Sequence, residues 1–574
     1  WKTRMDANEK HGIPGLLKHL ENHGVIEAFR IVSGKSSAKR TTIFWTDSDL
    51  FKWMEGAAFV LQSTDDPKLR AKLDELIDEV VAVQRPDGYL NTFFSGDLAD
   101  QRFRNLPVEH ELYCAGHMFQ AAVAHYRATG DDKFLNCASR YADFLAGYFG
   151  YDKHQGVDGH PEVEMALVEL HRSTGKKSFL DLAEYFLSQW DFRNKQEVTG
   201  HAVRAMYLCC GGADYFAETG DAAYGAAVER LWHDLTLRKM YITGGVGSYY
   251  AGEEIGWAYD LPNERAYAET CAAIASAMFS YRMLQITGES KYADEMERAF
   301  YNGVISGVSL DGTAYFYQNP LACYRDYQRQ EWFDCTCCPT NMVRTLASIP
   351  GYMYSTSDEG IWVHLFDNSE VDWTLADGTP FRLKIDTRYP WDGNIKITVD
   401  LDAPKEFTIF VRRPGWCREY EAELPSGTGE PNADGYIAIR KFWQPGERVS
   451  FELMMPVQLM DCDPRVEEDY GLVAIQRGPL VYCAESPDNT GLTIRDTGVS
   501  ADVFEASFQP DLLGGVVKVT GEGATAAAQE GANPLYAPIG ERLDDQSKAP
   551  ITLIPYYAWA NRGASHMRVW LPLR

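Results

Sequence analysis

Apolar positions in the first 355 residues recur at the spacing of amphipathic helices, and one short phrase interrupts them repeatedly. The phrase is Thr-Gly followed by a charged residue, with an aromatic residue four positions after the glycine. It occurs at Gly130, Gly175, Gly220 and Gly288, and the first three of these are 45 residues apart. Because glycine just past a helix end adopts the left-handed conformation of a cap, each phrase predicts the turn of a helical hairpin.

About six hairpins fit before residue 355, since further pairs of amphipathic stretches lie at 49–62 and 67–84 and at 266–287 and 292–304. Six hairpins can close into an (α/α)6 toroid, and a closed ring leaves no end that a polar capping repeat must cover. An open solenoid is the structural alternative. We therefore predict an (α/α)6 barrel over residues 1–355.

After Tyr354 the pattern changes to short runs of β-branched and aromatic residues separated by Pro, Gly and Asp. The runs lie at 361–366, 381–387, 394–401, 406–412, 436–440 and 449–454. They predict a β-sandwich over residues 356–465. A second β-rich region favours a C-terminal β-sandwich over 487–574, in which the polar stretch 521–533 is expected to be an exposed loop. The predicted fold class is multidomain α+β.

Composition excludes some partners and draws attention to the cysteines. The net charge of −27 repels phosphate and anionic lipid, and no apolar run approaches the ~18 residues of a membrane span, so we expect a soluble protein without nucleic acid or membrane partners.

Twelve cysteines are too sparse over 574 residues for a disulfide scaffold. Half of them are locally clustered or face a cluster, which is more typical of metal chemistry.

Two motifs could supply metal ligands. Cys335, Cys337 and Cys338 stand in Cys-Thr-Cys-Cys-Pro before a helical stretch, and Glu269 and Cys271 stand in Glu-Thr-Cys before another. The positive end of a helix dipole favours thiolate. A carboxylate with three thiolates makes a plausible tetrahedral zinc set. From spacing alone, buried free thiols beside a capping carboxylate are nearly as good an interpretation.

Acid–base and hydroxyl-binding groups are also present. Glu253 and Glu254 follow the glycine-rich stretch 244–248, which lacks the lysine of a phosphate loop; either is a candidate general acid, or a solvated loop charge. The dipeptide Gly-His places His117, His160 and His201 about one hairpin apart, so that they would converge on a toroid cavity. His110 shares such a helix-start position, and Asp47 and Asp49 could join it. Core imidazoles bonded to carbonyls are the alternative.

At these residues the chain resembles glycoside hydrolase family 127, whose founding activity is β-L-arabinofuranosidase. The resemblance rests on Tyr-Asp-Leu-Pro-Asn at 259–263, on Glu-Thr-Cys at 269–271 and on Cys-Thr-Cys-Cys-Pro-Thr-Asn at 335–341. Further landmarks lie at 110–117, 476–482 and 555–562, so it extends from near residue 45 to the C-terminus. The family layout implies that segment 466–486 returns to the barrel.

The resemblance implies a zinc ion held by Glu269, Cys271, Cys337 and Cys338. Cys337 would be the nucleophile, and Glu253, sixteen residues before Glu269, the acid/base; a slip of one residue would make it Glu254.

It further implies that His110, His160 and His201 bind the sugar, that Tyr317 lies near the nucleophile and that Cys335 is no ligand. The expected activity is that of a retaining, exo-acting glycoside hydrolase releasing a terminal β-L-arabinofuranose or similar furanose. The acid should have a raised pKa in an apolar cavity. A homodimer through the β-sandwiches is a hypothesis that no motif tests.

Two rival functions remain open at this point. One is a toroid-fold lyase, epimerase or hydrolase that uses histidine or carboxylate chemistry around a purely structural zinc. The other is a non-catalytic sugar-binding protein, against which the full set of acid, thiols and histidines argues.

Overall fold

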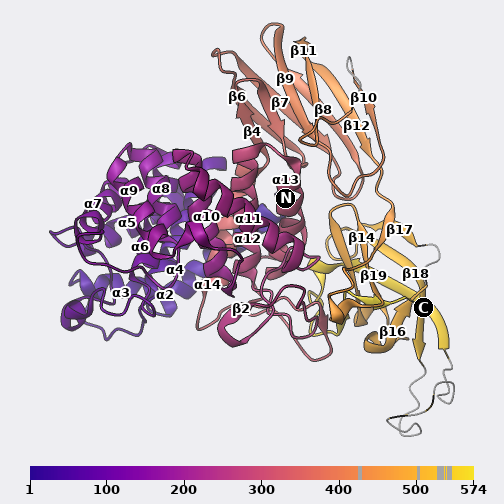
Figure 1. Ribbon diagram of the computed structural model, residues 1–574, viewed down its shortest axis with the longest axis horizontal. Helices are drawn as coiled ribbons and strands as arrows, with labels where there is room; N and C mark the ends of the chain where they lie inside the picture. The colour runs from indigo at the N-terminus through magenta and orange to yellow at the C-terminus, as the bar shows by residue number, and fades with distance from the viewer. Residues whose placement is uncertain (425–429, 501–503, 527–535, 537, 539–545, 574) are drawn as a thin grey trace.

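The computed structural model describes residues 1–574 except 425–429, 501–503, 527–535, 537, 539–545 and 574. A helical N-terminal part, a two-sheet domain and a C-terminal sheet follow one another along the chain (Figure 1). The predicted multidomain α+β class is confirmed. None of the helices in the described ranges is long and apolar enough to cross a membrane.

Six inner helices form a closed ring. They are α4 (Asp47–Ser63), α6 (Glu111–Thr129), α8 (Val163–Thr174), α10 (Ala202–Thr219), α12 (Thr270–Thr287) and α14 (Cys337–Ser348). Each packs against the next, and α14 packs against α4. This closure confirms the toroid and rules out the open solenoid.

The outer layer follows the predicted hairpins for five of the six positions. Helices that pack on the preceding inner helix are α5 (Pro67–Val83), α7 (Lys133–Tyr148), α9 (Lys177–Gln189), α11 (Ala222–Arg238) and α13 (Ser290–Arg298). The sixth inner helix, α14, instead packs against N-terminal turns, namely α1 (Lys2–Ala7), η1 (Asn8–Gly12) and α2 (Ile13–Asn22), with α3 (Val25–Val32) beyond them. The last hairpin therefore joins the two ends of the domain.

Left-handed glycines end four of the inner helices, as the recurring phrase predicts. Gly130, Gly175, Gly220 and Gly288 have φ of 72°, 72°, 66° and 73°. Each donates its N–H to a carbonyl four residues earlier, which satisfies a group that the helix end would otherwise leave unpaired.

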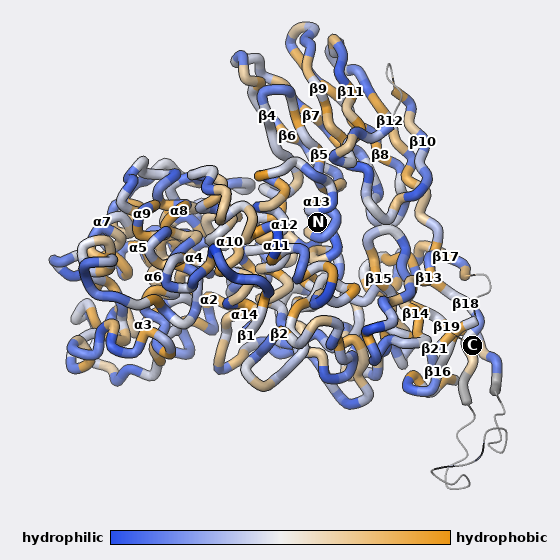
Figure 2. The backbone as a smooth tube through the Cα atoms, viewed as in Figure 1, coloured by the Kyte–Doolittle hydropathy of each residue, from blue (hydrophilic) through white to orange (hydrophobic). Residues whose placement is uncertain are grey.

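The middle domain is a sandwich of two sheets. One has the order β10-β12-β8-β7-β6 and the other β11-β9-β5-β4. Their strands are β4 (Tyr354–Ser357), β5 (Gly360–Val363), β6 (Ser369–Thr374), β7 (Pro380–Thr387), β8 (Asn394–Asp400), β9 (Lys405–Arg412), β10 (Tyr420–Glu423), β11 (Tyr436–Trp443) and β12 (Glu447–Leu453). Exposed and buried positions alternate along β7 and β8, so each strand buries one face. Figure 2 colours the strands of this domain by the hydropathy of their residues.

Within the described residues, the C-terminal strands pair into one connected sheet. They are β13 (Val457–Met460), β14 (Leu472–Arg477), β15 (Leu480–Glu485), β16 (Thr497–Val499), β17 (Glu505–Gln509), β18 (Val516–Ala526), β19 (Gln546–Pro555), β20 (Met567–Arg568) and β21 (Leu571–Pro572). The predicted C-terminal β-sandwich over 487–574 stays a prediction. The expected loop at 521–533 is wrong for 521–526, which extend β18; the remainder lies outside the described residues.

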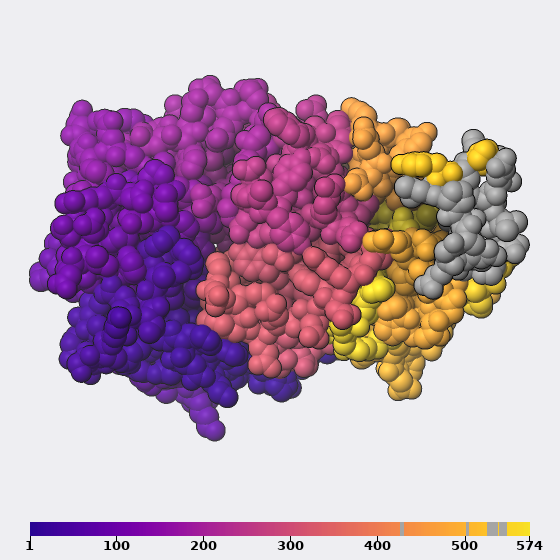
Figure 3. All heavy atoms as spheres, turned by 90° about the horizontal axis from the view of Figure 1, so that it is seen from below, coloured from indigo at the N-terminus to yellow at the C-terminus, as the bar shows by residue number. Residues whose placement is uncertain are grey.

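This sheet is anchored to the helical part. Strand β3 (Ala322–Cys323) of the helical part pairs with β20. Segment 466–486 contributes β14 and β15 to the sheet, and Asn302 binds its turn by donating to the Pro479 carbonyl (2.9 Å) and accepting from the Val481 N–H (2.8 Å). From below, the segment around residues 300–350 lies between the N-terminal helices and the C-terminal sheet (Figure 3).

An ion cluster joins the sandwich to the toroid, and its loss should be measurable. Arg412 of β9 is 1% exposed and pairs with Asp294 and the buried Glu297 of α13. Arg412→Met leaves the Glu297 carboxylate buried without its cation, so we expect a lower thermal unfolding midpoint, equivalent to a loss of about 3 kcal/mol. Arg440→Met is the control, because Arg440 is 74% exposed and pairs with Glu406 at 3.4 Å; we expect about 0.5 kcal/mol or less there. Equal shifts would contradict a role for the cluster.

Candidate active site

The N-terminal ends of all six inner helices meet around one cavity of about 750 Å³. Each end contributes a side chain singled out in the sequence. They are Asp49 of α4, His110 before α6, His160 before α8, His201 before α10, Glu269 and Cys271 at the start of α12, and Cys337 at the start of α14. The ring thus brings together residues almost 300 positions apart, at the positive ends of the helix dipoles.

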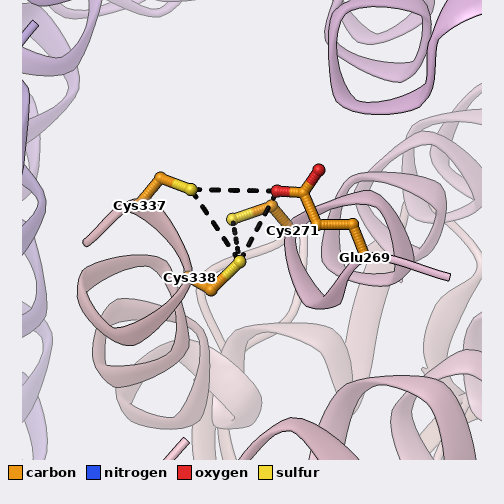
Figure 4. A group of neighbouring side chains, drawn as sticks. All are labelled: Glu269, Cys271, Cys337 and Cys338. Carbon is orange, nitrogen blue, oxygen red and sulfur yellow. Dashed lines mark hydrogen bonds between the residues drawn. The ribbon is translucent and has the colours of Figure 1, made fainter. Parts of the chain in front are cut away.

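Glu269, Cys271 and Cys337 line this cavity, and Cys338 contacts all three. The Cys338 sulfur lies 3.4 Å from Cys271 Sγ, 3.8 Å from Cys337 Sγ and 3.5 Å from Glu269 Oε1. Cys337 Sγ lies 3.8 Å from the same carboxylate oxygen. The three sulfurs and the carboxylate point toward one another (Figure 4).

These donors suit a tetrahedral metal ion. Bonds of about 2.3 Å to sulfur and 2.0 Å to oxygen place neighbouring ligand atoms about 3.5–3.8 Å apart, close to the distances seen. Glu269 Oε2 is buried with no hydrogen-bond partner among the described residues. Burial, followed by the negative charge of Cys337, raises the pKa of Glu269 well above its usual range. A cation would relieve both the repulsion and the unpaired oxygen.

Local structure fixes the two helix starts against each other. Glu269 is the N-cap residue of α12, and the extended segment 316–319 runs beside it: Thr270 N–H donates to the Tyr317 carbonyl at 3.0 Å. The Tyr317 hydroxyl consequently lies 3.1 Å from Cys337 Sγ and 3.8 Å from Cys335 Sγ. Thr340 ties α14 to α4 by donating to Asp49 at 3.3 Å.

Asp158 and Gly159 hold two histidines of the cavity in place. The fully buried Asp158 accepts from the N–H groups of Leu112 (2.9 Å) and His160 (2.9 Å), so it caps α6 beside His110. Gly159 is required by close packing, since a Cβ there would lie 2.0 Å from the Pro107 carbonyl oxygen. The rings of His110 and His160 are 5.5 Å apart, and those of His160 and His201 5.7 Å.

His117 does not line the cavity, although the Gly-His spacing predicts that it should. It lies in the second turn of α6, fully buried, with Nδ1 3.2 Å from Glu162 Oε1. Gly116 serves helix packing, because a Cβ there would meet Val163 N at 2.9 Å. Gly159 and Gly200 instead precede helices. The same dipeptide therefore arises for two different structural reasons. Asp47, another candidate, is turned toward Thr92 and accepts its N–H at 2.7 Å.

Glu253 faces the cavity from a strained loop. Its φ of 55° and that of Gly252 (70°) turn the chain sharply, and Glu253 Oε2 lies 2.7 Å from His201 Nε2. Val203 N–H donates to His201 Nδ1, so the ring proton of a neutral His201 is on Nε2, toward Glu253. The Glu253 oxygen, His201 nitrogen and Glu269 oxygen all lie within 4.8 Å of one another. Glu254 is exposed and makes no such pair.

The expectation of a raised pKa for Glu253 is wrong for this structure. Burial favours the protonated form, but hydrogen bonding to His201 and its charge, with a further hydrogen bond from Tyr267, lower the pKa of Glu253 below its usual value. The cavity is polar at this point, not apolar as expected from the sequence.

Family models match nearly the whole chain. A model described as the catalytic domain of GH127 β-L-arabinofuranosidase matches residues 1–351. The middle-domain model of the same family matches 360–455, and its C-terminal-domain model 457–572. The chain belongs to glycoside hydrolase family 127. As a member of this family it is a glycoside hydrolase.

Individual family 127 relatives align over nearly their full length. A non-reducing end β-L-arabinofuranosidase of Bifidobacterium longum subsp. longum is 35% identical, over 96% of this chain and 93% of its own. A GH127 β-L-arabinofuranosidase from Geobacillus stearothermophilus T6 superimposes with a TM-score of 0.96 at 38% identity, covering 100% and 99% of the two chains. A second GH127 β-arabinofuranosidase structure gives 0.93 at 36%, covering 100% and 95%.

Two basic residues at the family 127 site escaped the sequence analysis. Lys52 is 1% exposed, one helical turn after Asp49, with Nζ 3.8 Å from the Asp49 carboxylate. Arg204 lines the cavity one turn after His201. Both follow a predicted site residue by three positions on a helix, which is the spacing of side chains on one face, so helical periodicity could have found them.

Proposed function

We propose that this glycoside hydrolase releases terminal β-L-arabinofuranose, acting from the chain end and with retention of anomeric configuration. Cys337 is the nucleophile and Glu253 the acid/base. The observation that most supports this proposal is the position of the Cys337 sulfur, which lies at a helix start in the cavity and is hydrogen-bonded to the Tyr317 hydroxyl. It also contacts Glu269, whose carboxylate lies close to the Glu253–His201 pair. The identity of the sugar is inferred from the activity for which the relatives above are named.

Zinc is the cofactor that we propose for this site. Glu269, Cys271, Cys337 and Cys338 would hold it, since thiolates with a carboxylate match its ligand preference and its tetrahedral geometry. A bound zinc ion supplies positive charge that keeps the thiols deprotonated at neutral pH.

In the first step the Cys337 sulfur attacks the anomeric carbon while the bond to the leaving oxygen breaks. Glu253 gives its proton to that oxygen, and a thioglycosyl–Cys337 intermediate remains. In the second step Glu253 takes a proton from water, whose oxygen attacks the same carbon as the carbon–sulfur bond breaks. The lowered pKa of Glu253 favours the carboxylate that this second step needs, and the first step draws on the minor, protonated form of the same group.

His110 and His160 suit the hydroxyl groups of a sugar because their imidazole rings are neutral. Burial, and after it the charge of Arg204, lowers the pKa of His110 to about 3. Burial also lowers the pKa of His160 well below its usual value. Since His160 Nδ1 lies 2.9 Å from the Pro161 carbonyl and donates to it, Nε2 is left as an acceptor for a hydroxyl.

A panel of aryl glycosides tests the function itself. We expect hydrolysis of the aryl β-L-arabinofuranoside, with β-L-arabinofuranose as the first product seen by NMR. Inverted product, or a clear preference for an α-furanoside or a pyranoside, would contradict the proposal.

Replacement of Glu253 and of Glu254, one at a time, tests which of the two is the acid/base residue. Glu253→Gln should lower turnover of an unactivated arabinofuranoside about 10²- to 10⁴-fold, because the proton donor is lost. A good leaving group needs little protonation, so the loss should shrink for a nitrophenyl glycoside, and azide should restore part of it. Glu254→Gln is the matched control and should stay within a few-fold of the unaltered rate. The reverse pattern would move the role to Glu254.

A further inference from the structure

The cavity contains a positively charged group without a partner. Arg204 lies on the first turn of α10, and its side chain lines the cavity beside that of His201. The only other lysine or arginine among the lining residues is Lys195, which lies over the ring of Trp190 at 5.9 Å. For Arg204, no hydrogen bond or ion pair to another residue is present in the described part of the chain, and its Nε is buried and unpaired.

An unpaired guanidinium is unusual at a half-buried position. It carries five N–H donors and stays charged, so its desolvation is normally offset by a carboxylate or by several acceptors. Arg344 of α14 follows this rule: it is 3% exposed and bonds to Glu55, Gln120 and Tyr207. The described residues therefore offer no acceptor to the N–H groups of Arg204, and a ligand or water must provide it.

The surroundings of Arg204 indicate the chemistry of that ligand. Its charge acts on His110, His160 and Glu253, so it lies near the groups proposed to face the sugar. Five carboxylate side chains line the cavity against two lysine or arginine side chains, which disfavours an anion. A hydroxyl group both donates and accepts, and so it can bridge the acceptor nitrogen of a neutral histidine and a donor of Arg204.

We propose that Arg204 is a specificity-determining residue that donates hydrogen bonds to hydroxyl oxygens of the furanose bound in the cavity. The assignment rests on the proposed function. It predicts that the contribution of Arg204 to kcat/KM depends on which hydroxyl groups the substrate carries.

The test couples an enzyme variant to substrate variants. Arg204→Met and Arg204→Lys are assayed with an aryl β-L-arabinofuranoside and with its 2-deoxy, 3-deoxy and 5-deoxy analogues. Arg204→Met should lower kcat/KM for the parent about 10- to 100-fold, the usual effect of hydrogen bonds to a charged donor. For at least one analogue the loss should nearly vanish, because the acceptor is already absent. Added guanidinium ion should restore part of the loss.

Controls separate this role from others. Arg238→Met, at the exposed end of α11, should stay within threefold of the unaltered enzyme. Unchanged metal content and unfolding midpoint show that Arg204→Met is folded. If Arg204→Met lowers kcat/KM equally on all four substrates, the role assigned to Arg204 is contradicted, while the proposed function is not. No hydrolysis of the parent by the unaltered chain contradicts the proposed function and this furanose assignment with it.

Discussion

Cys337→Ser should lower turnover by on the order of 10³-fold or more, with all substrates of the enzyme. The hydroxyl of serine is a far weaker nucleophile at neutral pH than a thiolate. Among the described residues, Cys337 bonds to the Tyr317 hydroxyl, the Glu269 carboxylate and the Cys338 sulfur, and none of these is a histidine that could activate a serine. Steady-state kinetics on an aryl β-L-arabinofuranoside measure the loss.

Cys335→Ser is the matched control, two residues away in the same motif. Its sulfur lies 3.8 Å from the Tyr317 hydroxyl and outside the four-residue cluster, so we expect less than a tenfold change. Because Cys337 is also a proposed ligand, the zinc content of both variants is measured. A serine variant that turns over at a rate near that of the unaltered enzyme would rule out cysteine as the nucleophile.

Metal removal should have the second-largest effect. A strong chelator should lower turnover by roughly 10³-fold, corresponding to several kcal/mol of electrostatic stabilisation, and zinc should restore it. The unfolding midpoint should fall as well, because binding of the ion no longer stabilises the folded state and the buried thiols and Glu269 must take up protons instead. Activity, zinc stoichiometry and calorimetry are followed together.

Single cysteine variants identify the ligands. Cys338→Ser should reduce bound zinc below one equivalent, whereas Cys210→Ser should leave it unchanged, since Cys210 is equally buried but lies in α10 near the Ala275 carbonyl. Full activity in a metal-free, folded protein would contradict the proposed cofactor. Loss of folding without any kinetic need for Cys337 would instead support a purely structural zinc.

The sequence predicted the toroid because its helix caps repeat. Gly130, Gly175 and Gly220 are left-handed helix caps, and such a cap depends only on the few residues around it. The sixth hairpin carries no such signal, because α14 and its partner helices lie at opposite ends of the domain. This sixth hairpin forms only through packing between segments that are distant in the sequence.

The site was predictable in its residue types and less so in its arrangement. Spacing cannot place Glu269 beside Cys337, since their contact depends on the adjacency of α12 and α14 in the closed ring. Family resemblance supplied that pairing. The Gly-His repeat misplaced His117, because Gly116 serves helix packing. The pKa of Glu253 depends on the pair with His201, which forms only when the loop turns at Gly252.

Trapping the intermediate tests the central claim most directly. Glu253→Gln slows the second step more than the first when the leaving group is good, so incubation with a dinitrophenyl β-L-arabinofuranoside should accumulate the glycosylated enzyme. Mass spectrometry of the digested protein is expected to find one pentosyl group on the peptide that carries Cys337, bound through sulfur. A pentosyl group on a carboxylate, or steady turnover with Cys337 always unmodified, would contradict the account.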